Sequence, residues 1–192
     1  MVTIYLCPVG ELPANALVTE LAKPYFPGAV PEILRRERGK PCFTGSANVH
    51  FSVSHSGEFV AVAFGESPVG IDLQQHKRRG SETLDDAIAR HKKIASRYFH
   101  PQEQKYLEAD PFEGFFRIWT AKESFVKRTG RGIDHGFGEI CILPRGESWQ
   151  DENGFFRQTE LPGGYTLTLS TEKPTEWCIK GSLLEGGFGA EG

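Results

Sequence analysis

Charged side chains interrupt an apolar helical segment, residues 115–130, in the second half of the chain. At about 100° per residue, its large apolar side chains share one broad face that should pack inward. Glu123 and Lys127 lie four residues apart along one edge of that face, and Lys122 falls within it. Burying a charge without a partner is costly. The three charges therefore either reach solvent, as an ordinary surface Glu–Lys pair would, or belong to a functional site.

Other side chains that could do chemistry stand in or beside predicted strands. Lys40 follows a glycine and precedes Pro41, which biases its backbone toward an extended form. Ser54 and His55 follow a strand-like run, and Asp72 stands between two large aliphatic residues of another run. Taken singly, such an aspartate is most simply a solvated residue on the outer face of a strand.

Considered together, these side chains suit one kind of ligand. The carboxylates of Asp72 and Glu123, with the cations of Lys40, His55 and Lys127, match a diphosphate bound with a hard metal ion. Mg²⁺ is typically held by one or two carboxylates, with phosphate and water oxygens completing its shell. Lysine and histidine can neutralise the remaining phosphate charge. The residues thus indicate phosphate chemistry without specifying the reaction.

Composition and missing motifs narrow the possible functions. The chain has 192 residues and a net charge of −3, which argues against nucleic acid as a partner. It contains no P-loop, no dinucleotide-binding glycine motif and no nucleophile elbow, and its four cysteines form no C-x-x-C pair. The first residues lack a signal-peptide pattern, and no apolar run is long enough for a membrane span. We therefore expect a cytoplasmic protein.

The elements that must position these residues follow the order strands, helices, strands, which is typical of an α+β fold. Helices are predicted at residues 11–23, 83–99, 101–110 and 115–130, followed by a glycine-rich loop at 130–138. Strands are predicted at residues 2–6, 33–38, 49–53, 59–64, 69–73, 139–143, 154–160, 165–170 and 177–180. A four-residue link should make the runs 59–64 and 69–73 a hairpin. Gly70 indicates a close approach by backbone or ligand.

Two of these segments together resemble a known signature. The run Val69-Gly70-Ile71-Asp72, followed by the run from Trp119 to Lys127, is similar to the motifs V-G-I-D and W-[ST]-x-K-E-[SA]-x-x-K of the Sfp-type 4′-phosphopantetheinyl transferases. The upstream Gly39-Lys40-Pro41 and the block FSVSHSG at residues 51–57 also resemble that family's motifs, in the same order. The resemblance covers about residues 33–142.

The resemblance implies a fold and a reaction. The fold would be a pseudo-twofold pair of similar α+β halves, each with a small antiparallel sheet packed on a long helix. The halves would be residues 1–97 and 98–185, meeting near residues 95–100, with a flexible tail at 186–192. Coenzyme A would bind between the halves of a monomer. The enzyme would move its 4′-phosphopantetheine group to a serine hydroxyl of an acyl or peptidyl carrier protein, releasing adenosine 3′,5′-bisphosphate.

The resemblance also assigns roles to the candidate residues. Asp72 and Glu123 would hold Mg²⁺ against the pyrophosphate, and Glu123 could help deprotonate the serine. Lys127 would bind the pyrophosphate. Coenzyme A would also be contacted by Lys40, Ser54, His55 and Lys122. Of these, His55 would contact the 3′-phosphate, and Lys122 is the first lysine of the second motif.

One departure from the motifs leaves an alternative open. Sfp-type members often carry a second acid two residues after the strand aspartate, and Gln74 occupies that position here. Residues that longer members place before the Gly-Lys-Pro motif are also not clearly matched. A non-catalytic coenzyme-A-binding relative, acting in regulation, is therefore the competing hypothesis.

Overall fold

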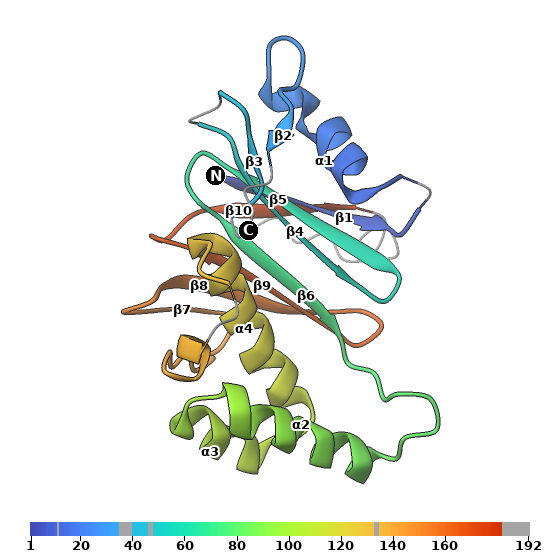
Figure 1. The fold of residues 1–192 in the computed structure, drawn as a ribbon, viewed down its shortest axis with the longest axis vertical. Coiled ribbons are helices and arrows are strands. Elements are labelled where there is room, and N and C mark those ends of the chain that lie inside the picture. Colours follow the sequence, from blue (N-terminus) through green and yellow to red (C-terminus); the bar gives the residue numbers. More distant parts are fainter. Residues whose placement is uncertain (11, 35–39, 46–47, 133–134, 182–192) are drawn as a thin grey trace.

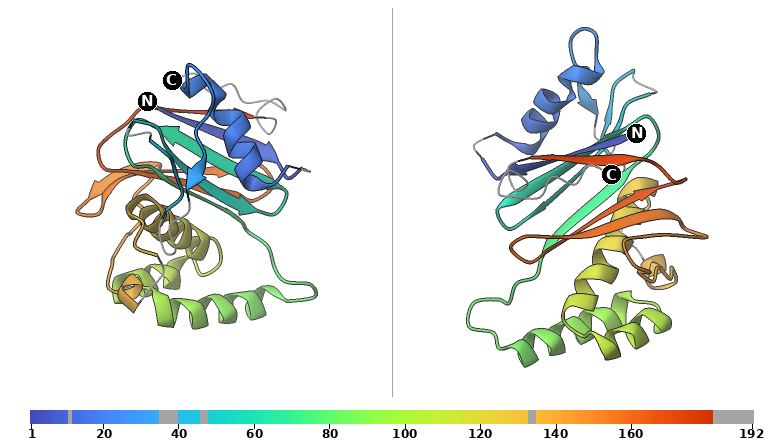
Figure 2. Two further views of the ribbon diagram at one scale, coloured as in Figure 1. Left: turned by 45° about the horizontal axis from the view of Figure 1, so that its top comes forward. Right: turned by 180° about the vertical axis from the view of Figure 1, so that it is seen from behind.

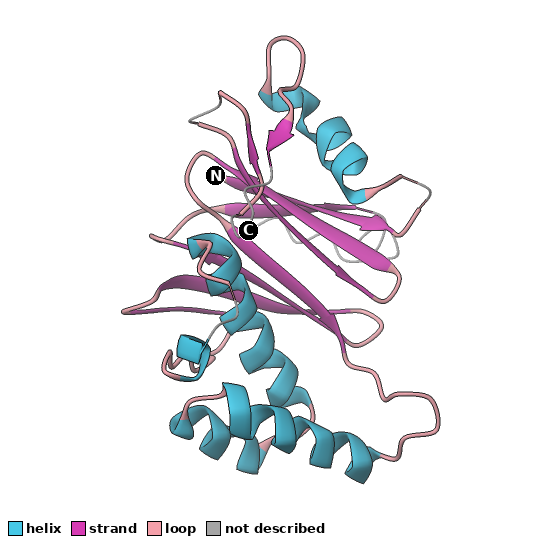
Figure 3. Cartoon of the chain, in the orientation of Figure 1, coloured by secondary structure: helices cyan, strands magenta, loops and turns pink. Residues whose placement is uncertain are grey.

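The computed structural model describes residues 1–10, 12–34, 40–45, 48–132 and 135–181. Its strands are β1 (Val2–Pro8), β2 (Ile33–Leu34), β3 (Cys42–Phe43), β4 (His50–Ser56), β5 (Phe59–Gly65), β6 (Gly70–Gln75), β7 (Ser148–Asp151), β8 (Gly154–Leu161), β9 (Tyr165–Thr171) and β10 (Trp177–Gly181). Its helices are α1 (Ala14–Ala22), α2 (Leu84–Tyr98), α3 (Pro101–Ala109) and α4 (Glu113–Thr129), with short 3₁₀ turns at Lys23–Tyr25 and His135–Gly138. The chain is thus a mixed α+β fold, as predicted (Figures 1 and 3).

Two four-stranded sheets lie face to face between helices (Figure 2). The first has the order β10-β1-β5-β4 and the second the order β6-β9-β8-β7. Ile4 and Leu6 of the first sheet pack against Ile71 and Leu167 of the second in one buried core. The helix α1 covers the outer side of the first sheet, and α4 packs on β6 and β9 of the second. No helix in the described ranges is both long and apolar enough to cross a membrane.

The first sheet differs in two details from the expectation of an antiparallel sheet on a long helix. Its edge strand β10 runs parallel to β1, so the sheet is mixed. Its covering helix α1 has only nine residues. The physical reason is that β10 arrives from the far end of the chain, where no tight turn dictates an antiparallel direction.

The sheets also exchange strands between the two expected halves. Strand β6 belongs to the first half in sequence but pairs with β9, whereas β10 belongs to the second half but pairs with β1. The boundary near residues 95–100 falls at the end of α2. The units 1–97 and 98–185 therefore stay a prediction about folding units and are not a division of the sheets.

The predicted hairpin between residues 59–64 and 69–73 was wrong. Strand β5 pairs with β4 on one edge and β1 on the other, so it has no free edge for β6. The true hairpin joins β4 to β5 through Gly57, whose φ of 56° suits a tight turn that places glycine first. Ser54 and His55 consequently lie within β4, and do not follow a strand as predicted.

Serine side chains join the edges of the two sheets. The hydroxyl oxygens of Ser52, Ser54 and Ser56 on β4 accept hydrogen bonds from the backbone N–H groups of Ile71, Leu73 and Gln75 on β6, at 3.0, 3.1 and 2.9 Å. Alternate residues of β4 thus contact alternate residues of β6, and the residue numbers increase in the same direction along both strands. The two strands run parallel, linked through side chains, with no backbone ladder between them.

The long helix α4 is buried on more than the one apolar face that the sequence predicts. Phe115 and Phe125 of that face contact the α2–α3 layer and the residues that follow α4. Toward the sheet, Thr120 contacts Thr168, with 2.7 Å between hydroxyl oxygens, and Arg128 donates to Ser170 at 3.0 Å. The helix ends at Gly130, which has the left-handed φ of 74° that glycine adopts easily.

The predicted close approach at Gly70 is confirmed. A Cβ atom on this glycine would overlap the backbone carbonyl oxygen of Ser124 and crowd the backbone nitrogen of Arg128. The backbone of α4 therefore rests directly on β6 at this point. This contact fixes the height of the helix charges over the strand that carries Asp72.

Other strand predictions differ in their bounds. Residues 139–143, predicted as a strand, are irregular, because buried side chains bond to their backbone in place of a neighbouring strand. Strand β7 was missed because its sequence, SWQD, has a single large apolar residue, Trp149, and so shows little alternation. The remainder of the predicted strand 33–38 and the predicted flexible tail lie outside the described residues.

Candidate functional site

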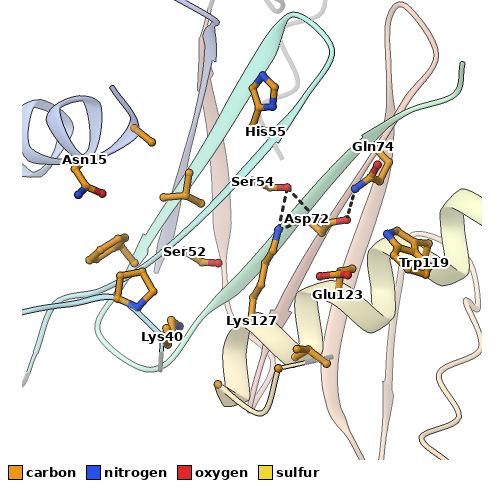
Figure 4. Close-up of a pocket in the computed structure, with 17 residues that line it drawn as sticks. Asn15, Lys40, Ser52, Ser54, His55, Asp72, Gln74, Trp119, Glu123 and Lys127 are labelled. Carbon is orange, nitrogen blue, oxygen red and sulfur yellow. Dashed lines mark hydrogen bonds and ion pairs between the residues drawn. The ribbon is translucent and has the colours of Figure 1, made fainter. Parts of the chain in front are cut away.

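A pocket of about 690 Å³ lies where β4, β6 and α4 meet (Figure 4). Six segments line it: the start of α1, the segment around Lys40, the strands β4 and β6, the helix α4 and the loop after it. Its lining residues are Ala14, Asn15, Lys40, Pro41, Phe51, Ser52, Val53, Ser54, His55, Asp72, Gln74, Trp119, Glu123, Val126, Lys127, Gly130 and Gly132. The fold thus brings together six of the seven predicted site residues, with Lys122 as the exception.

Asp72 is the centre of the polar cluster in this pocket. Its side chain projects from β6 on the face opposite Ile71 and Leu73, and the residue is only 1% exposed. Its Oδ1 accepts hydrogen bonds from Ser54 and Lys127, each at 2.7 Å, and its Oδ2 accepts one from the Gln74 amide at 3.1 Å. The alternative of a solvated aspartate on the outer face of a strand is therefore excluded, and the carboxylate is held by three donors (Figure 4).

Glu123 faces the same pocket from α4. Burial, together with the negative charge of Asp72, raises the pKa of its carboxyl to about 7, against the opposing effect of Lys127. Lys127 forms its ion pair with Asp72, at 2.7 Å. The ligand-free site thus carries a paired carboxylate and a second, poorly neutralised one.

The donor set fits a hard divalent cation completed by ligand oxygens. Within the described ranges no group of three His, Cys, Asp or Glu side chains is arranged to hold a metal ion by itself. Two carboxylates that repel one another nevertheless match a cation that also takes phosphate and water oxygens. Asp72 and Glu123 are the residues that would hold such an ion.

Two further cationic side chains lie around this cluster. The Lys40 ammonium donates to the carbonyl of Val69, and burial, with the nearby charge of Arg128, lowers its pKa to about 8. His55 is exposed, and Figure 4 shows it extending from β4 apart from the Asp72 cluster. These positions suit contacts to separate anionic groups of one extended ligand.

Lys122 occupies a different place from the one its motif position suggested. It is 1% exposed and pairs with Glu103, which is fully buried, at 2.9 Å. The Lys122 ammonium also donates to the carbonyl of Ile140, and Glu103 accepts from the backbone N–H of Ile142 at 2.7 Å. The lysine therefore ties α4 to α3 and to the segment after the glycine loop. Its expected contact with coenzyme A is not retained.

Sequence reasoning missed Glu103 as the partner of that lysine, and it missed Asn15 and Trp119 as pocket-lining residues. Glu103 gave a signal only as the third residue of a helix, where its carboxylate accepts from the His100 N–H at 2.8 Å. Asn15 lies in a segment whose helical pattern is weak, and Trp119 was counted with the apolar face.

Comparison with known proteins identifies the family. The model of the 4′-phosphopantetheinyl transferase superfamily matches residues 68–182. The chain belongs to this superfamily. The match includes β6 with Asp72 and the whole of α4, so it spans both carboxylates of the pocket.

Curated members of the superfamily cover this chain in part. The 4′-phosphopantetheinyl transferase Sfp of Bacillus subtilis (strain 168) is 30% identical over 154 residues, which are 72% of this chain and 62% of that protein. The transferase psf-1 of Bacillus pumilus is 38% identical over 106 residues, 53% of this chain and 41% of the relative. AcpT of Salmonella typhimurium is 33% identical over 106 residues, 53% and 50% of the two chains. This superfamily chain thus spans less than two thirds of these relatives.

Proposed function

We propose that this chain transfers the 4′-phosphopantetheine group of coenzyme A to a serine hydroxyl of an acyl or peptidyl carrier protein, releasing adenosine 3′,5′-bisphosphate. One observation carries the proposal. Two carboxylates, two lysines and a histidine, from four separate segments of the chain, line a single pocket in a member of the transferase superfamily. Coenzyme A, which has a diphosphate and a separate phosphate, is a ligand that can engage all five side chains.

The pocket suggests how the substrate is held. Lys127 pairs with Asp72 and can bind the pyrophosphate, while Lys40 and His55 can bind phosphate oxygens nearer the nucleotide. Asp72 and Glu123 would hold Mg²⁺, which supplies neutralising charge at the pyrophosphate oxygens when bound.

The reaction requires stabilisation of the negative charge that develops on the leaving oxygen and transfer of one proton from the serine. Attack by the carrier serine on the phosphorus next to the pantetheine arm breaks the bond to the bridging oxygen, and negative charge grows on that leaving oxygen. Lys127 stabilises this charge, and holding the reactants in line lowers the entropic part of the barrier. Glu123 can accept the serine proton, directly or through water. No covalent intermediate with the enzyme is needed.

The direct test is intact mass spectrometry of apo carrier proteins, acyl and peptidyl, incubated with this chain, coenzyme A and Mg²⁺. The mass of a carrier should increase by one phosphopantetheine group, and chelating the Mg²⁺ with EDTA should prevent this. D72N should lose the transfer, whereas D85N, which neutralises an exposed aspartate on α2, should retain it. Transfer by D72N at the rate of the parent chain would contradict the proposed role of the carboxylate.

The competing proposal is a coenzyme-A-binding relative without transferase activity. The observation that favours it is Gln74, whose amide donates to Asp72 where an acid would supply another negative ligand. Under this proposal coenzyme A binds, but no carrier gains mass. Restoring the acid with Q74E should then produce transfer, and robust transfer by the parent chain would exclude this alternative.

We further propose that the protein works in the cytoplasm as a monomer. Coenzyme A and carrier proteins are available there. Both carboxylates gather in one pocket with Lys40, His55 and Lys127 of the same chain, which supports a site completed within a monomer. Size-exclusion chromatography with light scattering tests the oligomeric state, and a dimer that dissociates with loss of transfer would refute this part.

A further inference from the structure

Ser54 lies between the strand that carries it and the carboxylate at the centre of the pocket. Ser54 is only 5% exposed. The hydroxyl donates to Asp72 Oδ1 at 2.7 Å, accepts from the backbone N–H of Leu73 at 3.1 Å and accepts from the Lys127 ammonium at 3.0 Å. One side-chain oxygen therefore contacts the backbone of β6, its aspartate and the lysine of α4.

These three bonds use the full capacity of the hydroxyl. A serine hydroxyl has one hydrogen to donate and two lone pairs that accept. Its hydrogen must go to Asp72, because an ionised carboxylate is acceptor-only, while the N–H of Leu73 and the ammonium of Lys127 are donors. A phosphate oxygen also needs a donor, so Ser54 cannot bind one without releasing the carboxylate.

We propose that Ser54 is a positioning residue for Asp72, and not a contact to the nucleotide of coenzyme A. It holds Oδ1 and so fixes the orientation of the carboxylate, whose Oδ2 accepts one hydrogen bond from the Gln74 amide and has a second lone pair for a divalent cation. This inference rests on the proposed function, because it assumes that Asp72 and Glu123 hold such an ion. It changes the role that the family resemblance assigned to Ser54.

The neighbouring serines explain why this position is special. Ser52 and Ser56 accept from backbone N–H groups of β6 in the same way, and so contribute to joining the two sheets. Among the side-chain hydrogen bonds that the structure describes for these three serines, only those of Ser54 reach a carboxylate. Ser56 does not line the pocket, so S56A removes a strand-joining bond of matched kind and leaves the cluster intact.

The test measures two ligands separately, without relying on turnover. Mn²⁺ binding is followed by electron paramagnetic resonance, and adenosine 3′,5′-bisphosphate binding by calorimetry in metal-free buffer. S54A should weaken Mn²⁺ binding by about tenfold, as expected when a group that orients a metal ligand is removed. Its affinity for the bisphosphate should stay within about twofold of that of the parent chain, since a charge-assisted bond to phosphate would be worth more than this.

Two further variants protect the test against a purely structural effect. S56A should leave Mn²⁺ binding unchanged although it loses a similar bond to β6. S54T, which keeps the hydroxyl, should restore Mn²⁺ binding toward the parent value. Circular dichroism and urea denaturation establish that each variant is folded before binding is measured.

The outcomes separate the two proposals. If S54A loses bisphosphate affinity and keeps Mn²⁺ affinity, Ser54 is a nucleotide contact and the positioning role is refuted, while the proposed transferase function stands. Equal losses in S54A and S56A would also refute positioning, because the effect would then belong to strand joining. Absence of Mn²⁺ binding in the parent chain, with or without the bisphosphate, would refute the metal site, and with it both proposals.

Discussion

Replacing Glu123 with glutamine should make the ligand-free protein more stable at alkaline pH. The carboxyl has an ordinary pKa of 4.5 and a pKa of about 7 in the folded chain, because it is buried and faces Asp72. Each pH unit between the two values is worth about 1.4 kcal/mol, so ionised Glu123 costs folding about 3 kcal/mol. Glu123 lies at a pocket wall that water reaches, and screening reduces the expected cost to about 2 kcal/mol.

The sign follows from proton counting. Between pH 4.5 and about 7 the folded state binds more protons at Glu123 than the unfolded state does. The stability contributed by the raised pKa is therefore complete below pH 4.5 and is lost as the pH rises through about 7. Glutamine does not titrate, so E123Q should match the parent chain near pH 4 and exceed it at pH 8.

The assay is urea denaturation of both chains at pH 4 and pH 8 in EDTA. At pH 8, E123Q should have the higher free energy of unfolding by about 2 kcal/mol, or a melting temperature higher by about 4–8 °C for a chain of this size. E139Q is the matched control, because Glu139 is exposed, and its stability should show no such pH dependence relative to the parent. E123Q should also lose transferase activity, an exchange of stability for function.

One result would refute this reasoning. If E123Q were equally or less stable than the parent at pH 8, the charge of Glu123 would not be held at a cost in the folded state. The pocket would then lack the carboxylate repulsion on which its affinity for a cation depends. A stability gain of the same size at pH 4 and pH 8 would point to packing and not to ionisation.

Three further changes test other parts of the structure. K122M should lower the free energy of unfolding by about 3–5 kcal/mol, because it leaves Glu103 buried without its cation. The double variant E103Q/K122M should recover part of this loss. Weaker coenzyme A binding by a stably folded K122M would instead favour the contact to coenzyme A that the motif implies. G70A should cost at least about 2 kcal/mol in urea denaturation, because α4 must move, whereas a Cβ on Gly28 meets nothing within 4 Å and G28A should be nearly neutral. Affinity for adenosine 3′,5′-bisphosphate should fall about tenfold from pH 7 to pH 9 as Lys40 loses its proton, and calorimetry should find this fall flattened in K40R, which stays charged; an equal fall in K40R would assign the titration to another group.

Much of the site could be predicted from sequence because its residues belong to local patterns. The helical period placed Glu123 and Lys127 on one edge of α4, and strand alternation placed Asp72 on the face opposite Ile71 and Leu73. Gly70 signalled a close approach, which α4 provides. These inferences hold because periodicity and backbone permissiveness are properties of a few neighbouring residues.

Partners that lie far apart in the sequence could not be predicted in this way. The local link between residues 59–64 and 69–73 suggested a hairpin, but β5 pairs with β1 on one edge and β4 on the other, which leaves no free edge for β6. The charge of Lys122 required a partner, and nothing near it in sequence identified Glu103, 19 residues earlier. Strand β10 likewise pairs with β1 across nearly the whole chain.

The sequence by itself determined which side chains are charged, which faces are apolar and where the glycines permit contact. Only the tertiary structure decided which buried charge meets which partner, and so separated Lys122, which stabilises the helical layer, from Lys127, which pairs with Asp72 in the pocket. Ser54 makes the same point, since its single hydroxyl is shared by β6 and α4. Hydrogen bonds and ion pairs act over a few ångströms in space, and the spacing of residues along the chain does not specify those distances.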